Sequence, residues 1–101
     1  MDLAGSESVS KSEAEGDRLE EAKFINVSLL YLSRVIRALV DKSKHVPYRD
    51  SCLTMLLRNC IGGNARTVLL VNASPSPWNY AESMSAIRFG QNAARIKNMA
   101  L

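Results

Sequence analysis

Three residues near the start of the chain have the types and spacing that sensing a phosphate requires: Asp2, Gly5 and Glu7. An aspartate at the end of a strand can hold the water shell of a phosphate-bound Mg²⁺. A glycine three residues later lets a bare backbone N–H approach a terminal phosphate. We therefore predict a switch loop in which Asp2 reaches a metal through water. Asp-x-x-Gly alone arises often by chance, so the prediction depends on the whole segment 2–7.

Other residues with reactive side chains favour simpler interpretations. The serines around Ser6 have no accompanying base, so Ser6 is expected to support the switch by hydrogen bonding. His45 has no second histidine or thiolate at ligand spacing, which favours a polar loop residue over a metal ligand. Cys52 and Cys60 would be separated by about 12 Å of helical rise, beyond the roughly 7 Å limit for a disulfide. We expect two free thiols.

The elements that must position these residues begin with a long helix from Leu19 to Val40. Apolar residues recur there at spacings of three and four, at Ala22, Ile25, Leu29, Leu32, Ile36 and Leu39. The opposite face is mostly cationic or neutral, with Lys23, Asn26, Ser33, Arg34 and Arg37. That face is either solvated or a binding surface.

Two further helices and one strand follow. Ser51 is a natural N-cap for a second helix with an apolar stripe to Ile61, ended by Gly62 and its neighbours. Asn79 can cap a third helix that runs to about Asn98. Between them, the continuous apolar run Val68–Val71 is typical of a strand covered on both faces in a parallel sheet.

The predicted strand has no partner strand within the chain. Its unpaired N–H and C=O groups would cost a few kcal/mol each if buried. We therefore expect the chain to be a piece of an α/β domain that needs the remainder to fold.

Composition narrows the classes of partner. The chain has 101 residues, 47% of them hydrophobic and 23% charged, with a net charge of +3. Most of its ten acidic residues precede Ala22, which leaves the rest basic and favours an acidic partner surface. Apolar runs fall short of the roughly 20 residues that span a bilayer, and basic residues are not interleaved with stacking aromatics. We expect a cytosolic protein that binds neither membranes nor nucleic acid.

Five motifs then agree in order and spacing with one family. They are Asp2-Leu3-Ala4-Gly5-Ser6-Glu7; Glu21-Ala22-Lys23 with Ile25-Asn26 and Ser28-Leu29; His45 to Ser51 with Leu53-Thr54; Gly62-Gly63-Asn64; and Phe89-Gly90 through Ile96-Lys97-Asn98. The chain resembles the C-terminal third of a kinesin motor domain. The resemblance implies residues 1–98 of such a domain, with 99–101 at the start of the neck-linker region.

For the nucleotide side, the resemblance implies an α/β, doubly wound fold of the P-loop NTPase type, with ATP and Mg²⁺ as cofactors of the complete motor. Asp2 would belong to the Mg²⁺ shell, and Gly5, between Ala4 and Ser6, would sense the γ-phosphate. Glu7 would pair with an arginine of the other switch loop. Asp2, Gly5 and Glu7 would then be the catalytic residues.

For the partner side, the resemblance implies a microtubule motor located on the cytoskeleton in the cytoplasm. The helix 19–40 resembles the family's relay helix, and the loop and helix after it resemble the elements that contact tubulin. The implied microtubule-binding residues are Lys23, Asn26, Arg34, Arg37, Lys42, Lys44, His45 and Arg49. Val27, Cys52 and Met55 stand where the family commonly has cations, and Phe24 where it has asparagine, which predicts weaker electrostatic attraction.

The sequence contains no Gly-x-x-x-x-Gly-Lys-Ser/Thr stretch. Without that backbone cradle and lysine, we expect no tight ATP binding by this chain alone. Three hypotheses remain open. The chain is part of a microtubule-stimulated ATPase, or an inactive microtubule-binding module, or a partial gene product without function.

Overall fold

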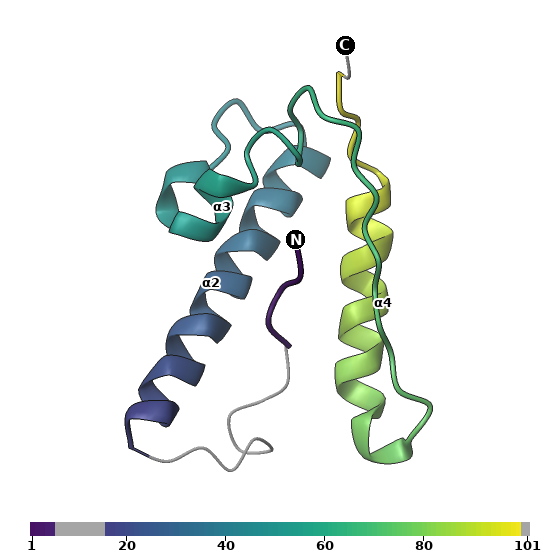
Figure 1. Ribbon diagram of the computed structural model, residues 1–101. Coiled ribbons are helices and arrows are strands. Elements are labelled where there is room, and N and C mark those ends of the chain that lie inside the picture. Colours follow the sequence, from purple (N-terminus) through teal and green to yellow (C-terminus); the bar gives the residue numbers. More distant parts are fainter. Residues whose placement is uncertain (6–15, 100–101) are drawn as a thin grey trace.

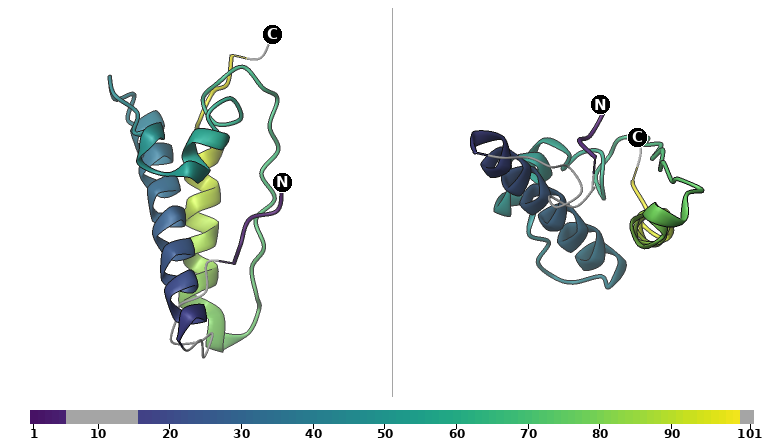
Figure 2. Two further views of the ribbon diagram at one scale, coloured as in Figure 1. Left: turned by 60° about the vertical axis from the view of Figure 1, so that its left-hand side comes forward. Right: turned by 90° about the horizontal axis from the view of Figure 1, so that it is seen from below.

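The computed structural model describes residues 1–5 and 16–99. Its helices are α2 (Asp17–Val40), α3 (Cys52–Leu56) and α4 (Tyr80–Ala94), with 3-10 helices η1 (Tyr48–Asp50) and η2 (Pro77–Asn79). The two long helices approach each other at their C-terminal ends and diverge toward their N-terminal ends, and α3 packs beside the C-terminal half of α2 (Figures 1 and 2).

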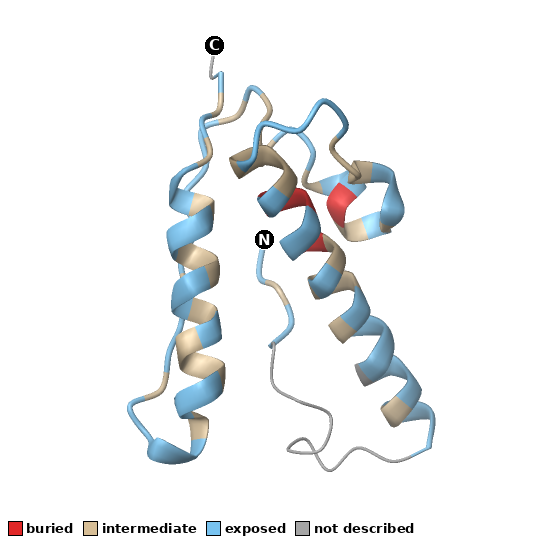
Figure 3. Cartoon of the chain, turned by 180° about the vertical axis from the view of Figure 1, so that it is seen from behind, coloured by how far each residue is buried: buried red, intermediate tan, exposed pale blue. Residues whose placement is uncertain are grey.

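The long helix α2 forms close to where its sequence predicts. It begins at Asp17 instead of Leu19 and ends at Val40, with acidic residues in its first turn and Arg37 in its last, which suits the helix dipole. Burial is confined to its C-terminal half, where Leu32, Val35 and Ile36 form the apolar core of the described residues. Figure 3 shows that this core lies where α2 meets α3.

The second predicted helix is shorter than expected. Ser51 caps α3 as predicted, since its Oγ accepts a hydrogen bond from the backbone N–H of Thr54 at 3.1 Å. The helix nevertheless ends at Leu56, and tighter turns follow, such as Cys60 N–H to the Leu57 carbonyl at 2.9 Å. The expected single stripe to Ile61 was therefore wrong. The Ile61 carbonyl instead accepts a hydrogen bond from the hydroxyl of Tyr48, 13 residues earlier in the chain.

The predicted strand Val68–Val71 is extended but is not part of a sheet: no strand occurs within residues 1–5 and 16–99. Val68 is 95% exposed and Leu70 is 82% exposed. The segment runs along α4 (Figure 1), and at Gly90 a Cβ atom would lie 3.0 Å from Val71 Cγ2. The expectation of one central strand thus needs correction, because a strand is defined by a neighbour that these residues do not supply.

The last helix is also shorter than predicted. Asn79 occupies the N-cap of α4, but its side chain donates to Ser74 Oγ at 3.3 Å instead of capping the helix. The helix ends at Ala94, not near Asn98, and its last turn closes with the Ile96 N–H bound to the Ala93 carbonyl at 3.1 Å. The residues after it leave the helix and turn toward the loop that follows α3 (Figure 1).

Candidate functional site

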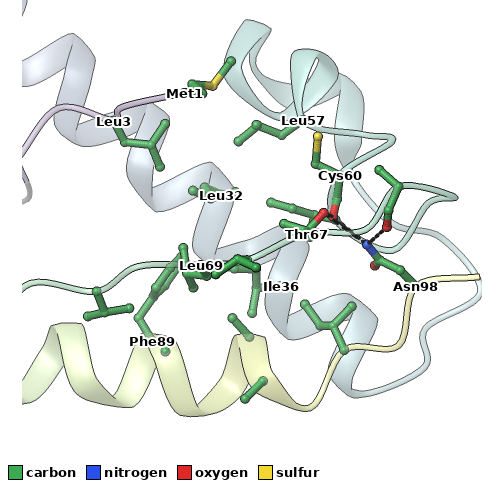
Figure 4. Close-up of a pocket in the computed structure, with 18 of the residues that line it drawn as sticks. Met1, Leu3, Leu32, Ile36, Leu57, Cys60, Thr67, Leu69, Phe89 and Asn98 are labelled. Carbon is green, nitrogen blue, oxygen red and sulfur yellow. Dashed lines mark hydrogen bonds between the residues drawn. The ribbon is translucent and has the colours of Figure 1, made fainter. Parts of the chain in front are cut away.

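The predicted switch loop lies on the surface as far as it is described. Asp2, Ala4 and Gly5 are exposed, whereas Leu3 is half-buried and lines a cleft (Figure 4). Ser6 and Glu7 lie outside the described residues. Leu3 therefore anchors the loop while Asp2 remains accessible to solvent.

The cleft has a volume of about 880 Å³ and lies between α2, α4 and the extended segment. Figure 4 shows its apolar walls, with Leu32 and Ile36 from α2, Leu69 from the extended segment and Phe89 from α4. Arg66 carries the only charged side chain among the described residues that line it. The lining suits further apolar protein layers and offers little to a phosphate.

A Mg²⁺–nucleotide site is not complete within the described residues. No group of three or more His, Cys, Asp or Glu side chains that could hold a metal occurs in residues 1–5 and 16–99. Asp2 is the one predicted metal-shell residue, and it is exposed. These residues do not by themselves fit the metal and nucleotide.

Asn98 ties the C-terminal end of the chain to the loop after α3. Its Nδ2 donates to the Cys60 and Ala65 carbonyls, both at 2.8 Å (Figure 4). Its Oδ1 accepts from the Gly62 N–H at 2.8 Å. Met99 N–H also donates to the Gly63 carbonyl at 2.9 Å. The sequence marked Asn98 as a helix end and as the last residue of a family motif, but it did not indicate these hydrogen bonds, since contacts this distant carry no local signal.

Gly62 is fixed by its backbone and by its neighbours. Its φ is +80°, in the left-handed region, and an added Cβ would lie 2.7 Å from both Leu39 Cδ2 and the Tyr48 hydroxyl. A side chain there is excluded by space as well as by conformation. The sequence predicted the turn, and the tertiary contacts add the steric requirement.

A polar network holds the loop before α3 against the loop after it. The Tyr48 hydroxyl donates to the Ile61 carbonyl at 2.6 Å, and Thr54, only 1% exposed, donates from Oγ1 to the Tyr48 carbonyl at 2.5 Å. Burial raises the pKa of the Tyr48 hydroxyl above its ordinary value of 10.0, and the nearby Arg58 guanidinium partly lowers it. Arg58 Cζ lies 5.6 Å from the centroid of the Tyr48 ring.

The predicted microtubule-binding residues share an exposed region. At about 100° per helical residue, the four on α2 fall within an arc of about 80°, opposite the buried Leu32 and Ile36. Seven of the eight are exposed and Asn26 is half-buried; the eight are Lys23, Asn26, Arg34, Arg37, Lys42, Lys44, His45 and Arg49. The structure thus brings together the α2 members, and the others follow along the connection to η1.

Lys42 adopts a left-handed conformation at the end of α2. Its φ is 55°, and the Ser43 N–H binds the Ala38 carbonyl at 2.9 Å while the Lys42 N–H binds the Leu39 carbonyl at 3.2 Å. This is the Schellman pattern, in which glycine is the usual left-handed residue. A lysine at that position carries backbone strain.

Sequence analysis missed an apolar component on the outer face of α2. Phe24 is 70% exposed, Val27 45% and Leu30 51%. Their spacing of three was visible in the sequence, but periodicity does not say which of two apolar faces is covered. The burial of Leu32, Val35 and Ile36 identifies the covered face.

Comparison with known proteins identifies the family to which these elements belong. The family model described as the kinesin motor domain matches residues 1–96. The chain belongs to the kinesin motor-domain family. It is 58% identical over 101 residues to a kinesin heavy chain of Neurospora crassa and 56% identical over 102 residues to kinesin-like protein 3 of Schizosaccharomyces pombe.

A solved kinesin structure matches in three dimensions. It is a KIF14 dimer in a two-heads-bound state with AMP-PNP in complex with a microtubule, and it matches with a TM-score of 0.93 and 41% identity over 99% of the chain. The chain covers only 28% of that structure's chain, and 11% and 18% of the Neurospora and Schizosaccharomyces kinesins. The described helices are therefore those of part of a kinesin motor domain. No helix in residues 1–5 and 16–99 is long and apolar enough to cross a membrane.

Proposed function

We propose that the chain is part of a microtubule-based motor that couples ATP hydrolysis to movement, and that it carries the switch II loop and the microtubule-facing elements. The observation that carries this proposal is the agreement of nearly the whole chain with a microtubule-bound kinesin. Exposed cations on the outer face of α2 and on the connection after it add independent support, because they suit an acidic surface.

On the nucleotide side, Asp2 would hold the water shell of Mg²⁺ and the Gly5 N–H would contact the γ-phosphate in the complete motor. Ala4 and Ser6 flank that glycine, and Glu7 would pair with an arginine from elsewhere in the domain. The exposure of Asp2 and Gly5, beside an anchored Leu3, supports these roles. ATP and Mg²⁺ are cofactors of the complete motor domain, whose doubly wound P-loop fold this chain completes.

On the microtubule side, α2 relays closure of the switch to the surface that meets tubulin. Its buried C-terminal half packs against α3, so a displacement of α2 moves α3 with it. The eight predicted residues from Lys23 to Arg49 make the contacts. Residues 1–98 belong to the motor domain and 99–101 begin the neck linker, and the motor works on cytoplasmic microtubules.

An inactive microtubule-binding module is the second candidate. The observation that favours it is the group of exposed cations on α2 and on the connection after it, which suits an acidic surface and needs no nucleotide. Such a module binds microtubules without hydrolysing ATP.

The test uses a grafted motor, in which residues 1–98 replace the matching segment of the Neurospora crassa kinesin heavy chain, to which this chain is 58% identical. The proposal predicts microtubule-stimulated ATP hydrolysis by the grafted motor and its loss on Gly5→Ala, with microtubule binding retained. A grafted motor that folds and binds ATP but hydrolyses none in the presence of microtubules contradicts the proposal. Binding of the 101-residue chain to microtubules together with an inactive graft supports the module instead.

A further inference from the structure

The outer face of α2 combines apolar and cationic side chains. Phe24, Val27 and Leu30 are 70%, 45% and 51% exposed. Helical rotation of about 100° per residue places all three within an arc of about 120°, and Lys23 and Arg34 fall inside the same arc. We call Phe24, Val27 and Leu30 the outer apolar stripe.

Burial elsewhere on the helix makes this stripe informative. A surface helix normally has one apolar face toward the core and a polar face toward solvent. The core face of α2 already contains Leu32, Val35 and Ile36, which are at most 3% exposed. The outer apolar stripe is therefore a second apolar face, and contiguous exposed apolar surface of this kind marks an interaction site.

Charge around the stripe restricts the kind of partner. From Ala22 to Val40 the helix contains no acidic residue, and its charged residues are Lys23, Arg34 and Arg37. Glu20, one turn before Phe24, is the acidic residue in the same arc, so cations outnumber acids around the stripe. The Arg34 guanidinium lies 5.2 Å from the centroid of the Tyr31 ring, which orients the cation along the helix surface. An apolar centre with a charged rim is the usual anatomy of a protein interface, and a cationic rim suits an acidic partner.

We propose that the outer apolar stripe docks directly on the microtubule surface, so that binding by this motor persists at salt concentrations that screen its cations. The inference rests on the proposed function, since it takes the microtubule as the partner of α2. It adds that the centre of the interface is apolar. The partner surface must then offer an apolar groove flanked by carboxylates.

Salt separates the two kinds of contact. The Debye length falls from about 10 Å at 0.1 M salt to about 3 Å at 1 M, so exposed ion pairs weaken steeply. Burial of apolar area is not weakened by simple salts in the same range, and it contributes in proportion to the area removed from water. An apolar centre therefore predicts a shallow dependence of microtubule affinity on salt.

The experiment measures co-sedimentation with purified microtubules over a salt series, using the full 101-residue chain and the grafted motor with AMP-PNP. Phe24→Asn and Leu30→Ser are expected to weaken binding on the order of three- to tenfold at every salt concentration. Val27→Lys is expected to tighten binding at low salt and to steepen its salt dependence. Ile87→Ser is the matched control, because Ile87 is an apolar residue of α4 that is also exposed, at 42%; it should leave affinity unchanged.

Three results overturn the inference. Binding that falls steeply with salt and ignores Phe24→Asn refutes an apolar centre while leaving the proposed function intact. Lack of binding by a folded, ATP-hydrolysing graft at low salt refutes both. A concentration-dependent dimer that Leu30→Ser dissociates, with microtubule binding unaffected, assigns the stripe to a second copy of the chain.

Discussion

The side chain of Asn98 completes the hydrogen bonding of the loop that contains Gly62, 36 residues earlier in the chain, with Oδ1 accepting from the Gly62 N–H at 2.8 Å. The same amide donates to the Cys60 and Ala65 carbonyls. One residue just beyond α4 thereby fixes the path of the chain just beyond α3. The segment after α4 and the loop after α3 are thus held together by hydrogen bonds at this point.

Replacing Asn98 with alanine should destabilise the grafted motor by about 1–3 kcal/mol. It removes the side-chain partner of the Gly62 N–H and of the Ala65 carbonyl, whereas the Cys60 carbonyl keeps its hydrogen bond from Thr67 Oγ1. Denaturant unfolding measures the free energy. Asn92→Ala is the control, since Asn92 is an exposed residue of α4, and it should change stability by less than about 0.5 kcal/mol. Equal effects of the two replacements would show that the Asn98 amide is not structurally important.

Gly62→Ala should lower the free energy of unfolding more than Gly16→Ala does. Both have positive φ, +80° and +60°, so a Cβ atom strains the backbone at each position. Only Gly62 also has Leu39 and Tyr48 atoms 2.7 Å from the new Cβ, whereas nothing lies within 4 Å at Gly16. The larger loss of unfolding free energy should therefore occur in Gly62→Ala, and similar losses would contradict the steric account.

Tyr48 should make stability sensitive to alkaline pH. Burial raises the pKa of its hydroxyl in the folded state above the ordinary 10.0. The folded state then favours the neutral phenol, so its contribution is fully present below pH 10 and is lost as pH rises through the raised pKa. Unfolding free energies measured from pH 8 to pH 11 should fall more in the parent than in Tyr48→Phe, which retains Tyr31 and Tyr80. Parallel curves would exclude a role for Tyr48 ionisation.

Lys42→Gly should raise the stability of the fold while it weakens microtubule binding. Glycine relieves the left-handed strain at φ 55° and should stabilise the grafted motor by about 1 kcal/mol. Lys44→Gly removes the same charge but has no left-handed strain to relieve, so it should not stabilise the fold. Both variants should weaken microtubule affinity at low salt by a small factor. Thermal melting and co-sedimentation check the pair, and stabilisation by Lys44→Gly would contradict the explanation.

The sequence correctly predicted those elements that depend on residues close together in the chain. The period of the apolar residues and the charges at its ends predicted α2 almost to its limits, and Ser51 predicted the start of α3. The free state of Cys52 and Cys60 was also predicted correctly. The opening motif and the motifs after it identified the kinesin family, because their order and spacing can be read directly from the amino-acid sequence. The roles of Asp2, Gly5 and Glu7 stay predictions.

The tertiary structure decided those features that depend on contacts between residues far apart in the chain. Val68–Val71 has a strand's composition, yet it remains an extended segment because a sheet needs partner strands. α3 stops at Leu56 while Tyr48 binds the Ile61 carbonyl, and Asn98 leaves α4 to bind the loop at Gly62. The sequence by itself determined the family, the long helix and one of its apolar stripes. The packing of α3 on α2 decided that Leu32, Val35 and Ile36 are buried, while the outer apolar stripe stays exposed.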